Sequence, residues 1–187
     1  TNKKDLHHYI SYYKPDLIIN AAGKVGGILT NSKNNFDFLN DNIIINYNII
    51  NVSKELNIKN LINLSSSCIY PVNYEKPFLE EKILNGKLES TNEGYALSKI
   101  YALKACEYLY KEKKLNYKTI IPCNLYGPHD NFNEKTSHMI PGAIARIFKA
   151  KKSNTDSIKI WGTGKVRREF MFIKDFIDFL FFSIQKF

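Results

Sequence analysis

Tyr95 and Lys99 stand four positions apart, near the start of a segment whose apolar residues recur with helical spacing. Side chains at positions i and i+4 of a helix lie on one face, about 6 Å apart at Cβ. A neighbouring ammonium lowers the pKa of a phenol, which suits a tyrosine that donates a proton near neutral pH. In a chain rich in tyrosine and lysine, the same spacing also fits an exposed helical pair without chemistry.

Three consecutive serines, Ser65, Ser66 and Ser67, end a short apolar run. In open parallel sheets, ligands bind at the carboxyl ends of the strands, where a serine can hydrogen-bond a substrate carbonyl beside the tyrosine. Serines in this place also simply begin turns. The helix with Tyr95 and Lys99 that follows the strand favours the catalytic interpretation.

The elements that must position these side chains alternate between short β-rich runs and longer amphipathic runs. This pattern predicts an α/β fold, a Rossmann-like doubly wound parallel sheet. We expect core strands at residues 16–21, 61–65 and 118–125, and a short strand at 157–161. A helix should open the chain, with crossover helices at 34–55 and 94–114 and a further helix at 140–151.

Composition places the chain among globular proteins. Its 187 residues, 44% hydrophobic and 24% charged, suffice for one well-buried core. The net charge of +9 could attract nucleic acid, but the lysines are scattered among glutamates and no nucleic-acid motif is recognisable. Anionic small molecules fit this charge better.

Cysteine usage and hydropathy indicate a cytoplasmic protein. Three cysteines, an odd number without metal-type spacing, indicate neither a disulfide framework nor a zinc site. No signal peptide opens the chain, and the apolar run 176–184 is interrupted by Asp178. It is also far shorter than the roughly 20 residues of a membrane span.

Neither end of the chain matches a whole Rossmann domain. The first residue is Thr1, and no G-x-x-G-x-x-G loop follows a first strand, although such a loop brings backbone amides against a dinucleotide pyrophosphate. The glycines of residues 23–27 have the wrong spacing. We therefore expect a truncated chain that lacks the first βαβ unit and most of a C-terminal substrate lobe, and that is inactive by itself.

Six stretches of sequence carry a resemblance to a known family. In order, they are AAGKVGGI, SSSCIYP, TNEGYALSK, NLYGPHDNF, SHMIPG and WGTGKVRREF. Together they resemble the signature of the GDP-L-fucose synthases, extended short-chain dehydrogenases/reductases of the NAD-dependent epimerase/dehydratase group. The resemblance implies conversion of GDP-4-keto-6-deoxymannose to GDP-L-fucose, by epimerisation at C3 and C5 and then reduction at C4 with NADPH.

The resemblance also assigns roles to single residues. Ser66, Tyr95 and Lys99 match the family's serine, tyrosine and lysine, with Tyr95 protonating the C4 oxygen. Cys68 and His138 match the acid/base pair of epimerisation. Inversion next to a ketone needs only a base on one face and an acid on the other, because the enolate spreads its charge onto oxygen.

Plainer interpretations of these residues stay open. Cys68 follows a strand, where a free cysteine is usually a small buried hydrophobic residue. His138 precedes a helix and also fits a polar surface position. Arg168 lies in the charged segment 165–169 and also fits a solvated charge.

Contacts with cofactor and substrate follow from the same resemblance. For NADP(H) it implies a set along the strand ends and in the first loop: Ala21, Ala22, Lys24, Leu64, Ser65, Ser66, Ser67, Tyr95, Lys99, Pro122, Cys123, Asn124, Leu125 and His138. For the GDP-sugar it implies Asn124, Arg146, Trp161 and Arg168. Guanidinium groups offer paired charged donors to a diphosphate, and an indole offers a flat apolar surface.

The chain is expected to contain parts of two domains and to form a dimer, and several other functions stay open. Residues 1–135 should belong to the NADP-binding domain and 136–187 should begin the substrate-binding region. The resemblance implies a homodimer through helices 34–55 and 94–114. The rivals are a reductase or epimerase of another 4-keto sugar such as a GDP-heptose, a UDP-sugar epimerase, a non-catalytic assembly subunit and, last, a nucleic-acid binder.

Overall fold

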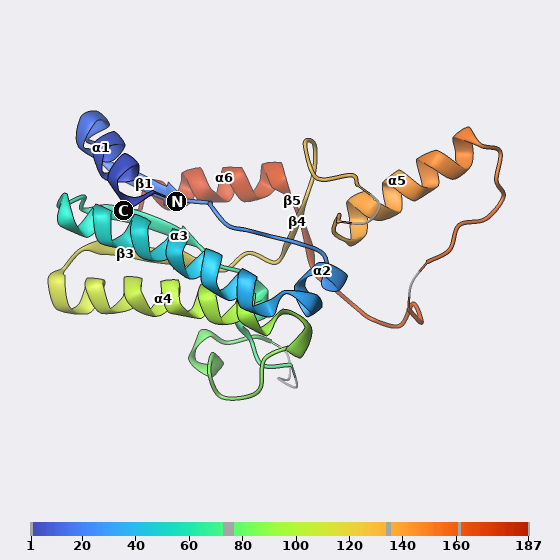
Figure 1. Cartoon of the computed structure of the whole chain (residues 1–187), viewed down its shortest axis with the longest axis horizontal. Helices are drawn as coiled ribbons and strands as arrows, with labels where there is room; N and C mark the ends of the chain where they lie inside the picture. Colours follow the sequence, from blue (N-terminus) through green and yellow to red (C-terminus); the bar gives the residue numbers. More distant parts are fainter. Residues whose placement is uncertain (1, 73–76, 134–135, 161, 187) are drawn as a thin grey trace. The chain divides into compact units, whose positions relative to one another are not determined.

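Three parallel strands, of which Figure 1 labels β1 and β3, organise the larger part of the chain in the order β1-β2-β3. They are β1 (Leu17–Asn20), β2 (Asn60–Leu64) and β3 (Asn116–Ile120). The computed structural model describes residues 2–72, 77–133, 136–160 and 162–186. The sheet belongs to a compact unit of residues 1–25 and 31–122, and residues 26–30 and 123–186 form a second unit.

Helices precede β1 and connect the three strands. They are α1 (Lys3–Tyr13), the short α2 (Ile28–Lys33), α3 (Asn35–Glu55) and α4 (Glu93–Lys113). Short 3₁₀ turns at Ser67–Ile69, Glu80–Lys82 and Ser90–Asn92 lie between β2 and α4. Since α3 and α4 each join parallel neighbours, all three strands end at the same edge of the sheet.

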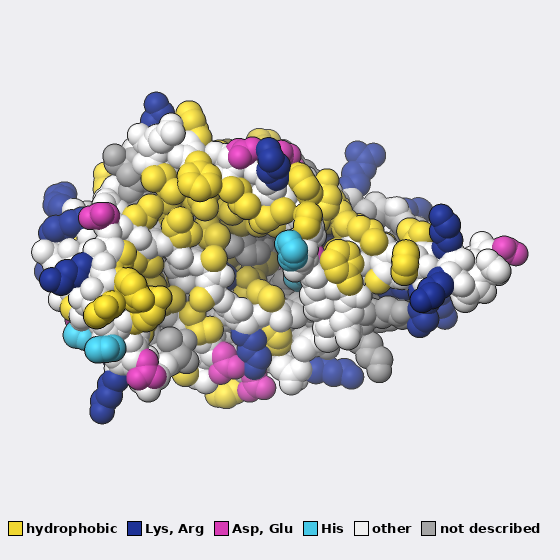
Figure 2. Space-filling view, turned by 90° about the horizontal axis from the view of Figure 1, so that it is seen from above, with side chains coloured by type: hydrophobic (Ala, Val, Ile, Leu, Met, Phe, Trp, Pro, Cys, Tyr) yellow, Lys and Arg dark blue, Asp and Glu magenta, His cyan; other side chains and the backbone are white. Residues whose placement is uncertain are grey.

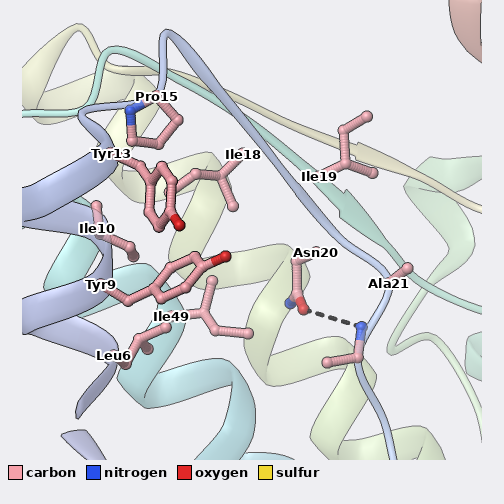
Figure 3. Close-up of a pocket in the computed structure, with 11 residues that line it drawn as sticks. Leu6, Tyr9, Ile10, Tyr13, Pro15, Ile18, Ile19, Asn20, Ala21 and Ile49 are labelled. Atoms are coloured by element: carbon pink, nitrogen blue, oxygen red, sulfur yellow. Dashed lines mark hydrogen bonds between the residues drawn. The ribbon is translucent and has the colours of Figure 1, made fainter.

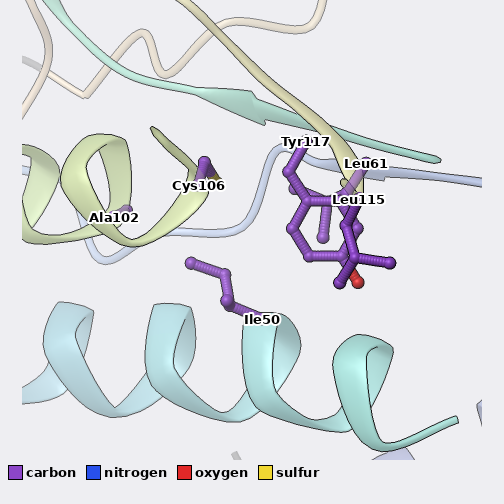
Figure 4. Close-up of a cluster of buried hydrophobic side chains, with 6 residues drawn as sticks. All are labelled: Ile50, Leu61, Ala102, Cys106, Leu115 and Tyr117. Carbon is purple, nitrogen blue, oxygen red and sulfur yellow. The ribbon is translucent and has the colours of Figure 1, made fainter. Parts of the chain in front are cut away.

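The core of this unit lies between the sheet and the two crossover helices (Figure 4). Leu61 and Tyr117 are cross-strand neighbours, and they pack with Ile50 of α3 and with Ala102 and Cys106 of α4. Leu115 completes the cluster. Both helices therefore cover the same face of the sheet. The Tyr117 hydroxyl donates to the carbonyl of Ile58 at 3.1 Å, which satisfies a phenol that is only 3% exposed.

The second unit contains two short parallel strands and two helices. The strands β4 (Asn124–Tyr126) and β5 (Phe170–Phe172) pair with each other, and the helices are α5 (Met139–Lys152) and α6 (Ile173–Ile184). Gly127 allows β4 to approach α6 closely, because a β carbon there would lie 2.4 Å from Ile173 Cγ2.

The structure confirms the α/β class and the parallel pairing of the strands. It also confirms the helix that opens the chain. The helices expected at 34–55, 94–114 and 140–151 begin and end within one or two residues of those bounds. The expected single strand 118–125 is wrong. It is two strands, β3 and β4, in different sheets. Pro122 lies in the gap and has no N–H to donate to a ladder.

The expected strand at 157–161 is also not found, since residues 157–160 have no strand pairing and Trp161 lies outside the described residues. Their alternating apolar pattern suits a half-buried strand, but Ile160 is 68% exposed and no described strand lies beside it. Periodicity alone cannot supply a pairing partner. None of the described helices is long and apolar enough to cross a membrane.

The buried thiol of Cys106 makes stability depend on alkaline pH. Burial raises its pKa from 9.0 to about 12, and it also raises that of Tyr117 to about 12. The unfolded chain then releases the Cys106 proton near pH 9 while the folded chain keeps it. The free energy of unfolding should therefore fall from pH 9 upwards, by about 1.4 kcal/mol per pH unit for one group, until about pH 12.

Urea denaturation of wild type and Cys106→Ala between about pH 8 and pH 11 checks this. We expect a shallower pH dependence in Cys106→Ala, whatever its absolute stability, and a smaller change of slope in the half-buried control Cys123→Ala. Parallel losses of stability in wild type and Cys106→Ala would show that the thiol contributes nothing to the slope.

Candidate active site at the carboxyl end of the sheet

Lys99 links helix α4 to the carboxyl end of β2. Its side chain is buried, at 4% exposure, and Nζ donates to the carbonyl of Leu64 at 2.9 Å. The same ammonium lies over the ring of Tyr95, 5.6 Å from the centroid. Burial lowers the pKa of Lys99, and the nearby Cys68 partly opposes that shift. The predicted tyrosine and lysine thus lie together, on a helix that touches the strand end.

Cys68 lies beside this pair. It belongs to the 3₁₀ turn that follows Ser66, whose backbone is extended. Burial raises the pKa of the Cys68 thiol, while a hydrogen bond with the Ser66 side chain and the charge of Lys99 both act to lower it. The structure therefore brings together Ser66, Cys68, Tyr95 and Lys99, the four predicted catalytic residues of the first unit.

Tyr95 differs from the expectation in its acidity. Burial is the main cause that raises the pKa of its phenol far above the usual value, and the nearby Cys68 adds to the shift. The ammonium of Lys99 does not offset this, because it lies over the ring and donates to the Leu64 carbonyl. The phenol is accordingly a neutral hydrogen-bond donor near pH 7, and the expected lowering of its pKa was wrong.

The start of α4 is fixed by Asn35 of α3. Asn35 Oδ1 accepts from the backbone N–H of Gly94 at 3.0 Å, and its Nδ2 donates to the carbonyl of Ser90 at 3.1 Å. A β carbon on Gly94 would lie 2.1 Å from the carbonyl oxygen of Asn35, so this close approach requires glycine. Tyr95 follows at once, and its backbone is held by this contact.

The loop after β1 carries the predicted residues Ala21, Ala22 and Lys24, all exposed. Asn42 of α3 holds the loop, since its Oδ1 accepts from the Lys24 N–H at 2.8 Å and its Nδ2 donates to the Lys24 carbonyl at 3.0 Å. A β carbon on Gly23 would lie 3.7 Å from Lys99 Nζ. The loop therefore borders the catalytic lysine.

Ser65 lies at the end of β2 with its side chain buried. The residue is 5% exposed, and its Oγ makes no hydrogen bond within the described residues. Its N–H donates to the carbonyl of Ile120 at 2.8 Å, which continues the pairing of β2 with β3. A buried hydroxyl at a strand end normally finds a partner, so this position suits a bound polar group.

The remaining predicted residues lie mostly in the second unit. His138 is exposed and precedes α5, and Arg146 of α5 is half-buried with Nε unpaired among the described residues. The exposed Asn124 donates to the carbonyl of Glu169 at 2.9 Å, and Arg168 is exposed. Pro122, Cys123 and Leu125 are half-buried, as are Leu64 and Ser67. Trp161 lies outside the described residues.

Two expectations stay predictions at this point. Cys68 and His138 belong to different units, so the structure does not test their pairing. The units divide the chain after Pro122 rather than after residue 135, and the assignment of 1–135 to cofactor and 136–187 to substrate is likewise untested.

Sequence reasoning missed the asparagines that hold the site. Asn35 and Asn42 position α4 and the first loop, and both lie in a helix that was interpreted only by its apolar stripe. Asn42 and Asn46 are both almost fully buried, at 0% and 1% exposure. Amide side chains four residues apart on the inner face of a helix were the available signal.

An apolar cavity of about 280 Å³ lies between α1 and β1 (Figure 3). Tyr9, Tyr13 and Ile18 line it, and Ala21 and Ala22 reach its edge. Its lining carries no carboxylate, amine or imidazole. In addition, no cluster of potential metal ligands occurs in the part of the chain that the structure describes.

Basic side chains are spread out. On the face that Figure 2 shows, Lys and Arg form small separate groups among white and yellow surface rather than one continuous patch. Several lysines elsewhere pair with acids, including Lys24 with Asp41 and Lys3 with Glu55, each at 2.7 Å.

Known proteins resemble the chain over its whole length. The NAD dependent epimerase/dehydratase family matches residues 1–187. A GDP-L-colitose synthase from Yersinia pseudotuberculosis is 47% identical over 99% of the chain and 60% of its own length. A GDP-L-fucose synthase from Azorhizobium caulinodans is 45% identical over 98% of the chain and 59% of its own length.

The fold agrees with these matches. A solved GDP-L-fucose synthetase from Naegleria fowleri, bound to NADP, superposes with a TM-score of 0.87 at 31% identity. The match covers 98% of this chain and 60% of that protein. The chain thus spans about three fifths of the length of the relatives it matches, and its Rossmann-like fold is established.

The charge of Lys99 should control the reactivity of Cys68. Because the ammonium lowers the thiol pKa, Lys99→Met should raise it and reduce the thiolate fraction at pH 8. Alkylation of Cys68 by iodoacetamide, followed by peptide mass spectrometry, should slow by up to about tenfold per unit of pKa change. The control Lys104→Met removes a half-exposed lysine of the same helix that pairs with Glu107 at 2.8 Å. Equal rates in wild type and Lys99→Met would contradict the electrostatic coupling.

Proposed function

Because this chain belongs to the NAD dependent epimerase/dehydratase family, we propose that it carries the reactive residues of a GDP-sugar epimerase-reductase. The preferred reaction converts GDP-4-keto-6-deoxy-D-mannose to GDP-L-fucose. The observation that carries the proposal is the grouping of Ser66, Cys68, Tyr95 and Lys99 at the carboxyl end of β2. Ligands of open parallel sheets bind at that edge.

The residues around Ser65 fit the nicotinamide half of NADP(H). The unpaired hydroxyl of Ser65 can take a polar partner, and the exposed loop with Ala21, Ala22 and Lys24 borders the same edge. When bound, NADPH supplies a hydride to the C4 carbon of the sugar. The solved relative from Naegleria fowleri is bound to NADP, which supports this choice of cofactor.

Tyr95 protonates the C4 oxygen during the reduction. Its phenol stays neutral because burial opposes ionisation, so it can donate a hydrogen bond to the carbonyl oxygen and then its proton. The Ser66 hydroxyl donates a second hydrogen bond to that oxygen. Lys99 lies over the ring of Tyr95 and, through its hydrogen bond to the Leu64 carbonyl, holds this face of helix α4 at the end of β2.

Cys68 and His138 exchange protons with the carbons next to the ketone. Burial keeps the Cys68 thiol protonated near neutral pH, which suits the group that delivers a proton. His138 is exposed at the start of α5, where its imidazole can serve as the base. Arg146, Trp161, Arg168 and Asn124 bind the GDP-sugar in this proposal.

A second candidate is a related sugar with the same chemistry. The Yersinia relative named for GDP-L-colitose is 47% identical, slightly more than the Azorhizobium relative named for GDP-L-fucose. Both names describe GDP-linked sugar products, so the nucleotide is the same while the sugar differs.

Dimerisation through α3 and α4 is part of the proposal. Both helices expose apolar side chains, among them Ile44 and Tyr47 of α3 and Leu97 and Tyr108 of α4, at 40–54% exposure. Tyr47 and Tyr101 of the two helices are close enough to interact electrostatically. Adjoining apolar surface of this kind is typical of an interface between subunits.

Two variants separate the two chemical steps. In the product of the full reading frame that contains residues 1–187, Tyr95→Phe should reduce NADPH oxidation with GDP-4-keto-6-deoxymannose by about 10²–10⁴-fold. Exchange of the sugar's C3 and C5 hydrogens with D₂O should persist. Cys68→Ser should instead retain NADPH oxidation and lose inversion at C3 and C5, which NMR of the product detects. Cys106→Ser, in the core, serves as the control.

Product identification by NMR distinguishes GDP-L-fucose from GDP-L-colitose. Turnover of GDP-4-keto-6-deoxymannose without any effect of Tyr95→Phe or Cys68→Ser would overturn the assignment of roles. A correctly folded full-length product that turns over no GDP-linked 4-keto sugar would favour the non-catalytic assembly role.

Tyr47→Glu should weaken the dimer by about tenfold or more, because it places a charge in an apolar contact. Sedimentation equilibrium measures the dissociation constant, with Tyr12→Glu on α1 as the control for an exposed tyrosine elsewhere, at 72% exposure. A wild-type protein that stays monomeric at high micromolar concentration would rule out this interface.

A further inference from the structure

Three asparagines are buried together beneath the catalytic helix. Asn20 ends β1, Asn46 lies in the middle of α3, and Asn63 lies near the end of β2. Their exposed fractions are 2%, 1% and 0%. Burying an amide side chain costs free energy unless its donors and acceptor are paired. Three such side chains in one core therefore need a structural or functional reason.

Asn20 is the centre of the hydrogen bonds that pair them. Its Nδ2 donates to Asn46 Oδ1 at 2.9 Å and to Asn63 Oδ1 at 3.1 Å. Its Oδ1 accepts from the N–H of Ala22 at 3.3 Å, in the loop that borders the site (Figure 3). Asn63 Nδ2 completes the network on the sheet with a long contact of 3.5 Å to Thr119 Oγ1 of β3.

Asn46 carries the network to the catalytic helix. Its Nδ2 donates to the carbonyl of Ser98 at 3.4 Å. Ser98 directly precedes Lys99, just as Asn63 directly precedes Leu64. Two adjacent residues of α4 are thus joined to two adjacent residues of β2 by two routes. One is the hydrogen bond from Lys99 to the Leu64 carbonyl, and the other runs through the three amides.

We propose that Asn46, through its buried hydrogen bonds to Asn20 and to the Ser98 carbonyl, is a positioning residue that sets the depth of Lys99 at the end of β2. This role rests on the proposed function, because it concerns the lysine of that site. Asn46 touches neither substrate nor reacting atoms and acts only through helix α4.

The chemistry of the amide favours this role over simple packing. An amide is neutral, so it adds no charge next to the ammonium of Lys99 and the thiol of Cys68. It also has both a donor and an acceptor, so it can join a backbone carbonyl on one element to a side-chain donor on another. Apolar contacts alone are less directional and leave a helix freer to shift along a sheet.

The test measures the position of Lys99 without nucleotide or sugar. Titratable groups that face the Cys68 thiol are Tyr95 and Lys99 of α4, and Lys99 provides the charge that favours the thiolate. Asn46→Ala should withdraw that charge and slow iodoacetamide alkylation of Cys68 at pH 8 by about threefold or more, in the same direction as Lys99→Met. The matched control is Asn51→Ala, which removes a half-buried asparagine of the same helix whose Nδ2 donates to the carbonyl of Tyr47 within α3.

A triple variant separates positioning from stability. Asn46→Ala alone should also lower the thermal midpoint by about 5 °C or more, because it leaves the Asn20 amide short of a partner. The variant Asn20→Val, Asn46→Ala, Asn63→Val removes all three amides and nearly conserves their summed volume, so it should recover much of that loss. Alkylation of Cys68 should stay slow in the triple variant.

The rates in the folded proteins decide the outcome. A triple variant that alkylates Cys68 as fast as wild type would overturn the proposal, because apolar packing would then hold Lys99 equally well. So would an Asn46→Ala rate equal to that of Asn51→Ala. If Asn46→Ala does not fold, the triple variant decides alone. The alkylation rates of Cys68 do not depend on turnover of any sugar. Failure of the proposed function, seen as absent turnover, is therefore distinguished from failure of this proposal, seen in the alkylation rates.

Discussion

The hydrogen bond from Lys99 to the carbonyl of Leu64 is the contact on which the site depends. An ammonium at 4% exposure has lost most of its water, so a protein acceptor must replace that hydration. The strand end supplies it, and the helix is thereby fixed at one depth. Because Tyr95 lies one turn earlier on the same helix and Ser66 and Cys68 follow the same strand, this one contact sets all four side chains against one another.

Desolvation gives the site its acid/base character. Burial opposes charge on every titratable group there: it raises the pKa of Tyr95 and Cys68 and lowers that of Lys99. A phenol and a thiol that stay protonated can serve as proton donors, and the charge of Lys99 lowers the cost of ionising the thiol. The buried side chains that join α3 and β1 to helix α4 behind these groups are neutral amides, which add no charge that would compete for the ammonium.

The sequence predicted the features that depend on local residue patterns. It missed those that depend on strand pairing or on hydrogen bonds between residues distant in the sequence. The tyrosine and lysine spacing, the serines at a strand end and the long helices were correct because helical period and the parallel-sheet edge fix such positions. The strand 118–125 was expected whole because apolar residues continue through Pro122; the proline marks the break, but nothing local says that the two halves enter different sheets. The buried asparagines were missed because asparagine resembles a surface residue until its partners, distant in sequence, are known.

The edge of β1 has a consequence for the behaviour of this polypeptide in solution. Among the described strands, β1 pairs only with β2, so the N–H and C=O groups of its other side point away from the sheet. Ile19 of this strand is 40% exposed, and it lines the apolar cavity between α1 and β1. A parallel strand is normally covered on both sides, and an open edge flanked by apolar surface is a template for another extended segment. Unless such a segment occupies it, the margin of the sheet favours self-association of chains, and the net charge of +9 is the main repulsion that opposes it.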